Sequence, residues 1–209
     1  MTLVLLLPAY WRYISVIIGV GVGVPFGRRA AGEIVSLTNL VVANVDLNNT
    51  DNIDPYGCSI SAANGVLTAV GTNAVSYQST PNFNQSIAGT LNAKIYMRCT
   101  MWIDNNVALY ADIRSEGNPR VSLASPPVQE WFVLSGFHTS SKTGNISYAP
   151  SNRYVSGEAA KDKVFRVKAL MAISTTSLPV KYQALSDSEL KALLDAKVPW
   201  FKGTANIAL

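Results

Sequence analysis

The sequence predicts an all-β protein: an antiparallel β-sandwich of the jelly-roll type, with an extended N-terminal arm and one short C-terminal helix. The run from Leu91 to Asp104 alternates strictly between apolar and polar residues, which is the period of a strand with one buried face. Several other short stretches of strand-forming residues are separated by turn signals, as in sandwiches and jelly rolls. A single helix start signal stands near the C-terminus.

The composition limits the classes of function. The chain has 209 residues, of which 48% are hydrophobic and only 14% are charged, against an average of about 25% charged residues in soluble domains. We therefore expect a surface rich in Ser, Thr, Asn and Gly, which suits extensive contacts with other chains. The net charge of +4 is spread along the sequence. It forms no basic stripe, so nucleic acid is not an expected partner.

The sequence offers little for a metal or a cofactor. Its only histidine is His138, and its two cysteines, Cys58 and Cys99, are far apart. A zinc site needs several such ligands at short spacing, so neither a metal nor a cofactor is expected. Cys99 lies on the apolar face of the long strand and is expected to be a buried free thiol. A disulfide with Cys58 stays open as an alternative.

The first 26 residues are the most hydrophobic segment and carry one charge, Arg12. The positive region that begins a signal peptide is absent, and Gly27-Arg28-Arg29 stands where small residues would precede cleavage. The uncharged run from Tyr13 to Phe26 is shorter than the ~18–20 residues that cross a bilayer. We favour an assembly arm against a neighbouring subunit, with a membrane or leader segment and a part of the domain core as alternatives. The arm is expected to make contact through Trp11, Tyr13, Ile17, Val20 and Phe26.

The chain divides into three parts: an arm and connector at 1–38, the sandwich at 39–180, and a capped helix and tail at 181–209 that pack on the sandwich. Strands are expected at 39–42, 66–70, 74–78, 91–104, 107–114, 128–137, 145–148 and 164–173. In the last of these, one continuous buried face is expected, made of Phe165, Val167, Ala169, Met171 and Ile173.

The helix is predicted by Ser186-Asp187-Ser188-Glu189, a capping box in which Ser186 caps the first turn and Glu189 reaches back. Leu185 and Leu190 occupy the positions of a hydrophobic staple, and Pro199 ends the segment. The residues after Pro199, beginning with Trp200, are expected to fold back onto the sandwich.

The outward face of the long strand is the candidate binding surface. Sugars present flat apolar faces and hydroxyl edges, so aromatic rings flanked by hydrogen-bonding groups suit them. The candidate carbohydrate-binding residues, taken from consecutive strands, are Tyr96, Trp102, Tyr110, Arg98 and Asp112. The alternative is that these rings pack beneath a loop, the C-terminal helix or a neighbouring subunit. Trp131 and Trp200 are expected in the core or an interface.

No enzymatic activity is expected. His138 has no nucleophile at a motif spacing, and the serines lack a Gly-x-Ser-x-Gly elbow. Asp104, Asp112 or Glu116 could supply paired carboxylates, but any β-protein offers such a set. The Gly-Val-Gly-Val-Gly run lacks the Lys-Ser/Thr of a phosphate-binding loop.

The order of motifs between residues 39 and 204 carries a family resemblance. The motifs are Asn39-Leu40-Val41, Asn64-Gly65-Val66-Leu67-Thr68, Lys94-Ile95-Tyr96-Met97-Arg98, Glu130-Trp131-Phe132-Val133-Leu134-Ser135-Gly136, the capped helix and Pro199-Trp200-Phe201-x-Gly203. Together they resemble the carbohydrate-binding-module-like jelly rolls found in tail, neck and capsid-attached proteins of bacteriophages. The resemblance implies a β-sandwich with a concave face, carried on a virion as an adhesion or decoration module.

Two functions follow as hypotheses. The first is a structural bacteriophage virion protein (decoration, fibre, or tail or neck associated), assembled in the host cytoplasm. It would dock by its arm onto other virion proteins, form homo-oligomers and display a jelly roll for adhesion to host-surface polysaccharide. The second is an exported or surface-anchored carbohydrate-binding module outside any virion. In the second hypothesis the N-terminal segment serves for export or anchoring. No nucleic-acid partner and no membrane span are expected.

Overall fold

The computed structural model describes residues 32–41, 47–51, 53–72, 82–104, 108–116, 118–155 and 157–209. All of them belong to one compact unit, Gly32–Leu209. The predicted assembly arm, with Trp11, Tyr13, Ile17, Val20 and Phe26, and the strand predicted at 74–78 therefore lie outside the described residues.

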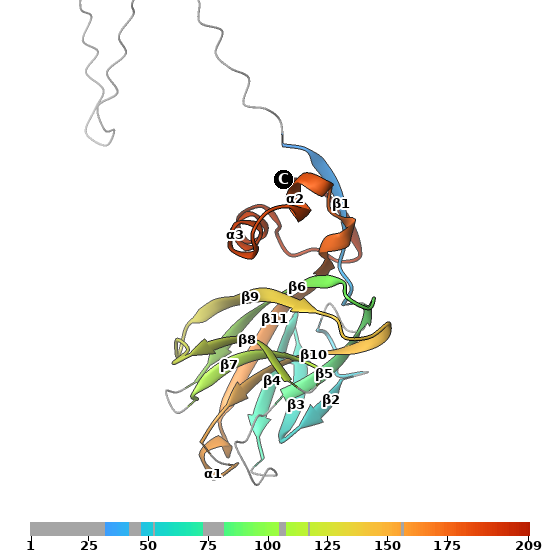
Figure 1. Cartoon of the computed structure of the whole chain (residues 1–209). Coiled ribbons are helices and arrows are strands. Elements are labelled where there is room, and N and C mark those ends of the chain that lie inside the picture. The colour runs from blue at the N-terminus through green and yellow to red at the C-terminus, as the bar shows by residue number, and fades with distance from the viewer. Residues whose placement is uncertain are drawn as a thin grey trace, which may run out of the picture. The chain divides into compact units, whose positions relative to one another are not determined.

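The body of the described unit is a pair of five-stranded antiparallel sheets (Figure 1). The first, here called the β10 sheet, contains in spatial order β2 (Asp54–Tyr56), β5 (Asn82–Gly89), β10 (Gly144–Arg153), β7 (Tyr110–Ser115) and β8 (Asn118–Ala124). The second, the β6 sheet, contains β3 (Cys58–Ala63), β4 (Val66–Gly71), β11 (Val164–Ser174), β6 (Lys94–Ile103) and β9 (Trp131–Thr139). From β4 onward the chain crosses between the sheets at almost every connection. The predicted antiparallel jelly roll is confirmed.

Strand β6 is an interior strand of its sheet and lies between β11 and the edge strand β9. Its apolar face is fully buried between the two sheets and consists of Ile95, Met97, Cys99, Met101 and Ile103. These side chains pack in one cluster with residues of the facing sheet, such as Ile113 and Tyr148. Both cysteines are buried and form no disulfide. Burial raises the pKa of Cys99 to about 12.

Strand β11 departs from its predicted alternation. Its register with β6 shifts between Lys168 and Met171, and Ala169 has a φ of +54°. A bulge of this kind inserts an extra residue and reverses the side-chain phase beyond it. Leu170 therefore joins the core between the sheets, whereas Met171 and Ile173 face the opposite side. The prediction of one continuous buried face through Ala169, Met171 and Ile173 is wrong for this reason.

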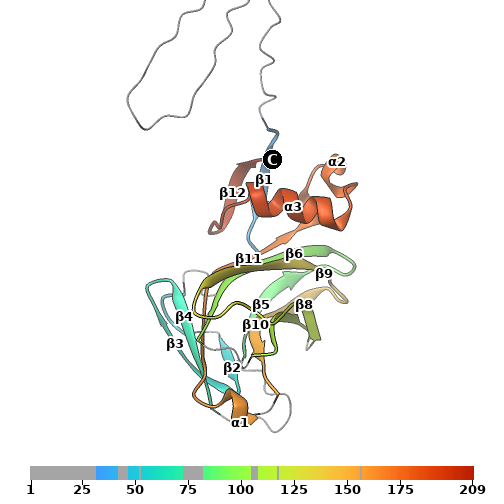
Figure 2. The same cartoon turned by 90° about the vertical axis from the view of Figure 1, so that its left-hand side faces the viewer.

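A second layer covers part of the outer face of the β6 sheet, and we call it the cap. It consists of β1 (Ile34–Thr38), the 3₁₀ turn Thr175–Ser177, α2 (Val180–Gln183), α3 (Asp187–Lys197) and β12 (Thr204–Ala208). β1 pairs antiparallel with β12, so residues assigned from the sequence to the connector are tied to the C-terminal tail. In Figures 1 and 2 these elements lie beside β6, β9 and β11, away from β5 and β10.

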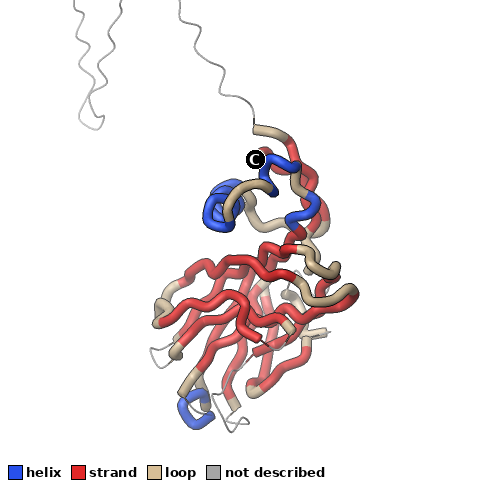
Figure 3. The backbone as a smooth tube through the Cα atoms, in the orientation of Figure 1, coloured by secondary structure: helices blue, strands red, loops and turns tan. Residues whose placement is uncertain are grey.

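The cap has its own apolar cluster. Its buried residues come from the cap and from the outward face of β6 and β11: Val35, Leu37, Tyr96, Met171, Ile173, Leu178, Leu190, Leu194, Val198, Phe201 and Leu209. α3 begins with the predicted capping box, in which Ser186 and Glu189 each bond the other's backbone N–H. Figure 3 shows helix α1 (Gly157–Ala160) at the end of the sandwich far from the cap.

Other predicted boundaries shift. β9 begins at Trp131 rather than at residue 128, and β10 is longer than the predicted 145–148. The strand predicted at 39–42 is wrong over its described residues, where Val41 forms an isolated bridge with Ile87. The sequence did not predict β1, β2, β3, β5, β8 and β12. Within the described part of the chain, no helix has the length and apolar character needed to span a membrane.

Candidate functional site

The residues predicted to form one binding platform lie in three different places. Ala111 and Ile113 of β7 point into the core, so Tyr110 and Asp112 point outward from the β10 sheet. Trp102 points outward from the β6 sheet, on the opposite side of the sandwich. The expectation that outward residues of these consecutive strands share one face is corrected, because β6 and β7 belong to opposite sheets.

Tyr96 and Arg98 lie beneath the cap. Tyr96 has no exposed surface, and its hydroxyl donates to Asp195 Oδ1 of α3 at 2.5 Å. Arg98 Nη1 donates to the carbonyl of Val198 at 2.7 Å. Both residues therefore hold the cap on the sheet, Tyr96 fully buried and Arg98 partly buried, which is the arrangement described by the alternative of packing beneath the C-terminal helix.

The carboxylate of Asp195 organises this contact. Ser135 Oγ donates to Oδ1 at 2.8 Å, and Lys191 Nζ donates to Oδ2 at 2.6 Å. Burial raises the pKa of Asp195, but the hydrogen bonds from Lys191, Tyr96 and Ser135 outweigh it and lower the pKa below its ordinary value. The carboxylate is thus held charged between α3 and the sheet.

Tyr110 and Asp112 form a compact network of their own. Asp112 is fully buried, accepts from Ser122 Oγ at 2.5 Å and has Oδ2 at 3.3 Å from Arg153 Nε. The same guanidinium lies over the Tyr110 ring, with its carbon 3.8 Å from the ring centroid. Because the Asp112 carboxylate is fully buried and has chain partners on β8 and β10, this network is best explained as support for β7, β8 and β10.

The part of the β6 sheet that the cap leaves uncovered carries an aromatic surface. Trp102 of β6 and Trp131 of β9 are direct cross-strand partners, as are Thr100 and Val133. Trp131 is 40% exposed and Val133 48% exposed. Lys168 and Arg166 of β11 face Thr100 and Trp102, respectively, across the next strand pair. We call these six residues the tryptophan face.

Each tryptophan of this face is paired with a cation. The guanidinium carbon of Arg166 lies 4.3 Å from the centroid of the Trp102 ring. Lys168 Nζ lies 4.1 Å from the centroid of Trp131, so its side chain reaches across β6. Such cation–π contacts contribute about 0.5–1 kcal/mol at exposed sites. Within the described residues, neither cation forms an ion pair with a carboxylate.

Trp200 marks the border between the tryptophan face and the cap. Its Nε1 donates to the carbonyl of Leu170, at the bulge of β11, at 3.0 Å. It folds back onto the sandwich as predicted, yet 40% of it is exposed. Trp131 was likewise expected in the core or an interface, and its 40% exposure excludes the core and leaves the interface open. The signal that marks it as outward is local: Phe132 and Leu134 are the apolar residues that β9 turns inward.

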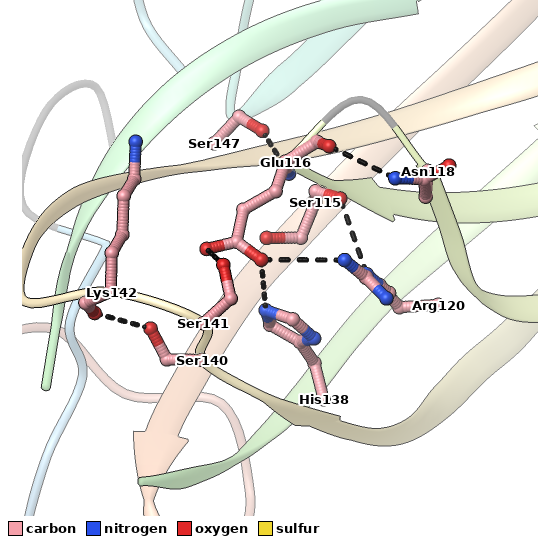
Figure 4. A network of polar contacts seen from close by, with 9 residues as sticks. All are labelled: Ser115, Glu116, Asn118, Arg120, His138, Ser140, Ser141, Lys142 and Ser147. Carbon is pink, nitrogen blue, oxygen red and sulfur yellow. Dashed lines mark hydrogen bonds and ion pairs between the residues drawn. The ribbon is translucent and has the colours of Figure 1, made fainter. Parts of the chain in front are cut away.

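The single histidine belongs to a polar network at the end of the sandwich (Figure 4). Glu116 follows β7 with a φ of +51° and has Oε2 at 3.3 Å from Arg120 Nη2 and 3.4 Å from His138 Nε2. Its Oε1 accepts from Ser141 Oγ at 2.8 Å. Since Glu116 and Arg120 flank the β7–β8 turn and His138 lies on β9, the network ties the two sheets together.

The charges of this network are set by burial and by neighbours. Burial and then Arg120 lower the pKa of His138, against the opposing effect of Glu116. Burial raises the pKa of Glu116, but Ser141, His138 and Arg120 together lower it by more than burial raises it. The pKa therefore lies below its ordinary value, and the carboxylate stays charged. In the described part of the chain, no group of three or more His, Cys, Asp or Glu side chains is placed to hold a metal ion.

Comparison with known proteins finds remote likenesses among solved structures. No family model and no curated protein matches the chain. Among solved structures it is similar to "Family 16 Carbohydrate Binding Module-2", at 12% identity and a TM-score of 0.44, over 65% of this chain and 100% of that one. It is also similar to the structure described as "CBM4 structure and function", at 11% identity and a TM-score of 0.44, over 65% and 93% of the two chains.

A third similar structure comes from a virus. It is the enzymatically active domain of tailspike protein 4 of bacteriophage CBA120, at 13% identity and a TM-score of 0.41, over 65% of this chain and 21% of that one. All three likenesses are remote. The jelly roll itself follows from the sheet topology of this chain, and what it binds must follow from its own side chains.

Proposed function

We propose that this chain is a glycan-binding module and that a polysaccharide lies across the tryptophan face. The observation that carries the proposal is the cross-strand pairing of Trp102 with Trp131 on an uncovered sheet face, with Trp131 40% exposed. A sugar ring has an apolar face of C–H groups that stacks on a flat aromatic ring. Its hydroxyl groups need donors and acceptors beside that ring.

Polar side chains continue the row of the two tryptophans across the whole sheet. Trp102 pairs with Arg166, Arg166 with Thr68 and Thr68 with Ser61, so one row crosses all five strands. With neighbouring strands about 4.8 Å apart, such a row is about 19 Å long. It offers two rings at one end and hydrogen-bonding groups at the other, over a length that suits an oligosaccharide.

The strand positions that carry the rings are anchored in the core. The strand neighbours of Trp102, Met101 and Ile103, are fully buried, and Leu134, three residues after Trp131 on β9, is 5% exposed. Tryptophan has few rotatable bonds, so fixing it in a complex costs little conformational entropy. A surface that is ordered in advance binds more tightly for the same contacts.

The test is a binding assay of Trp102→Ala and Trp131→Ala on bacterial surface polysaccharides, by glycan array and affinity electrophoresis. Each variant should weaken binding at least about tenfold, in line with the ~1.4 kcal/mol or more that a buried aromatic contact contributes. The matched control is Tyr56→Ala, which removes a ring that is 52% exposed on the other sheet. Unfolding curves show whether each variant is folded. Failure of the wild type to bind any glycan contradicts the proposal.

A second copy of the chain is the competing occupant of the tryptophan face. Light scattering of the wild type and of Trp131→Ala, both without glycan, distinguishes a second copy of the chain from a glycan as the occupant of this face. If the substitution lowers the oligomeric mass, the face is a subunit interface and the glycan proposal fails. If the mass is unchanged while glycan binding is lost, the proposal stands.

The proposal extends to a virion as the setting, with the module displayed as a structural decoration, fibre, tail or neck protein for adhesion to host polysaccharide. The motif order of residues 39–204 and the apolar segment 1–26 support it. The alternative is an exported or surface-anchored module. Deleting residues 1–27 should abolish incorporation into particles while the domain stays folded. Unchanged incorporation would count against an assembly arm.

A further inference from the structure

The two cations of the tryptophan face indicate the class of sugar, an inference that rests on the proposed glycan binding. We infer that this face selects acidic polysaccharides, whose uronic-acid carboxylates pair with Arg166 and Lys168 while the sugar rings stack on Trp102 and Trp131.

The charged side chains of the tryptophan face are all positive. Within the strand bounds, the outward positions of the β6 sheet that the cap leaves uncovered carry Arg166 and Lys168 and no carboxylate. Two carboxylates stand next to the face in the chain: Asp104 follows β6 and accepts from the backbone N–H of Val164 at 3.0 Å, and Glu130 precedes β9 and is exposed. On the uncovered strand positions themselves, an anionic ligand meets two positive charges and no negative charge, a complementarity that favours association.

Three lysines in or beside the cap each have a carboxylate partner. Lys94 of β6 lies 2.6 Å from Asp187, Lys191 2.6 Å from Asp195, and Lys181 2.8 Å from Glu33. Arg166 and Lys168 rest on aromatic rings, at 4.3 and 4.1 Å from the centroids, and form no ion pair with a carboxylate of the described residues. A ring holds a cation by its quadrupole alone, more weakly than a carboxylate that accepts charge-assisted hydrogen bonds from it.

This difference produces selectivity. A sugar carboxylate draws each cation from its indole into a stronger ion pair, bidentate for Arg166, and so uncovers the ring for the C–H face of the same sugar. A neutral sugar has to displace the cation from the ring and returns only neutral hydrogen bonds. Arg166 and Lys168 thus strengthen the binding of an acidic polymer and weaken the binding of a neutral one.

The position of the cations suits a polymer with repeated charges. Arg166 and Lys168 are two residues apart on one face of β11, which separates their Cα atoms by about 6.7 Å. Each has its own ring, Trp102 on β6 and Trp131 on the edge strand β9. The face therefore offers two cation–ring units side by side, each able to take one uronic acid.

The experiment compares polygalacturonate, alginate and hyaluronan with the carboxyl-reduced form of each polymer, by affinity electrophoresis and calorimetry on the full chain. At least one acidic polymer should bind ten times or more tightly than its reduced form, with an advantage that declines as salt is added. Arg166→Gln and Lys168→Gln should each remove most of this advantage. The matched control is Lys181→Gln, whose ammonium also lies on a ring, that of Tyr182 at 4.8 Å, but on the cap.

The outcomes are distinguishable. Equal binding of the acidic and reduced forms, lost in Trp131→Ala, overturns the inference and leaves glycan binding intact. If the protein binds no acidic polymer, no reduced polymer and no glycan on the array, both the inference and the proposed glycan binding are overturned. If Lys181→Gln weakens acidic binding as much as Lys168→Gln does, the preference comes from net charge and not from the tryptophan face, and the inference fails.

Discussion

Tyr96→Phe tests how the cap is held on the sandwich. The hydroxyl of Tyr96 is buried and donates to Asp195 Oδ1 at 2.5 Å, while Ser135 donates to the same oxygen at 2.8 Å and Lys191 to the other at 2.6 Å. The substitution removes one of three donors and keeps the ring, which packs 5.8 Å from Phe137 between centroids. Any change in stability therefore reports the hydrogen bond.

The expected loss is about 1.5 kcal/mol in the free energy of unfolding. A hydrogen bond to a charged group contributes about 1.5–3 kcal/mol. The lower end applies because the Asp195 side chain is 31% exposed and keeps two donors after the substitution. The matched control is Tyr182→Phe. That hydroxyl donates to the main-chain oxygen of Leu209 at 3.4 Å, at the weak limit of a hydrogen bond.

The loss should also depend on pH in a defined direction. Burial raises the pKa of Asp195, but Lys191, Tyr96 and Ser135 lower it below the ordinary value of 3.8. A carboxyl with a lowered folded-state pKa contributes stability that is present above its unfolded pKa and is lost as the pH falls through the folded pKa. The difference between the wild type and Tyr96→Phe should therefore be full at pH 7 and shrink below about pH 3.8.

The assay is urea unfolding followed by tryptophan fluorescence at neutral and acidic pH. The reasoning is refuted if Tyr96→Phe loses no more stability than Tyr182→Phe does, or if its loss is the same at both pH values.

Two further predictions concern buried titratable groups. Burial and Arg120 lower the pKa of His138 below 6.5, so its contribution to stability is present above pH 6.5 and lost as the pH falls further. His138→Gln should flatten the pH dependence of unfolding between about pH 7 and 5, and an unchanged slope would contradict this. Burial raises the pKa of Cys99 to about 12, so its thiol should react with a thiol reagent only after unfolding; labelling of Cys99 in the folded protein argues against it.

Local patterns predicted the parts of the fold that depend on one strand or one helix at a time. The alternation of Ile95, Met97 and Cys99 with polar residues gave the buried face of β6. The capping box at Ser186 and Glu189 gave the start of α3. These features were predictable because the period of a strand and the bonds of a helix cap are fixed by neighbouring residues.

The candidate site was only partly predictable for a reason that Tyr96, Trp102 and Tyr110 illustrate. All three are outward aromatic residues, and only Trp102 belongs to the tryptophan face. Tyr96 is covered by a helix that comes about a hundred residues later, and its partner Asp195 has a sequence separation of 99. Tyr110 lies on the opposite sheet. The bulge at Ala169 also escaped prediction, since it depends on pairing with β6.

By itself, the sequence determined which residues alternate, where the helix begins and that the protein would be an antiparallel β-sandwich. Only the tertiary structure decided which strands are neighbours, which outward rings the cap covers, and that Trp131 stands opposite Trp102 with Lys168 and Arg166 upon the two rings. The physical reason is that a strand's side-chain period is a local property, whereas its partners in a jelly roll come from distant parts of the chain.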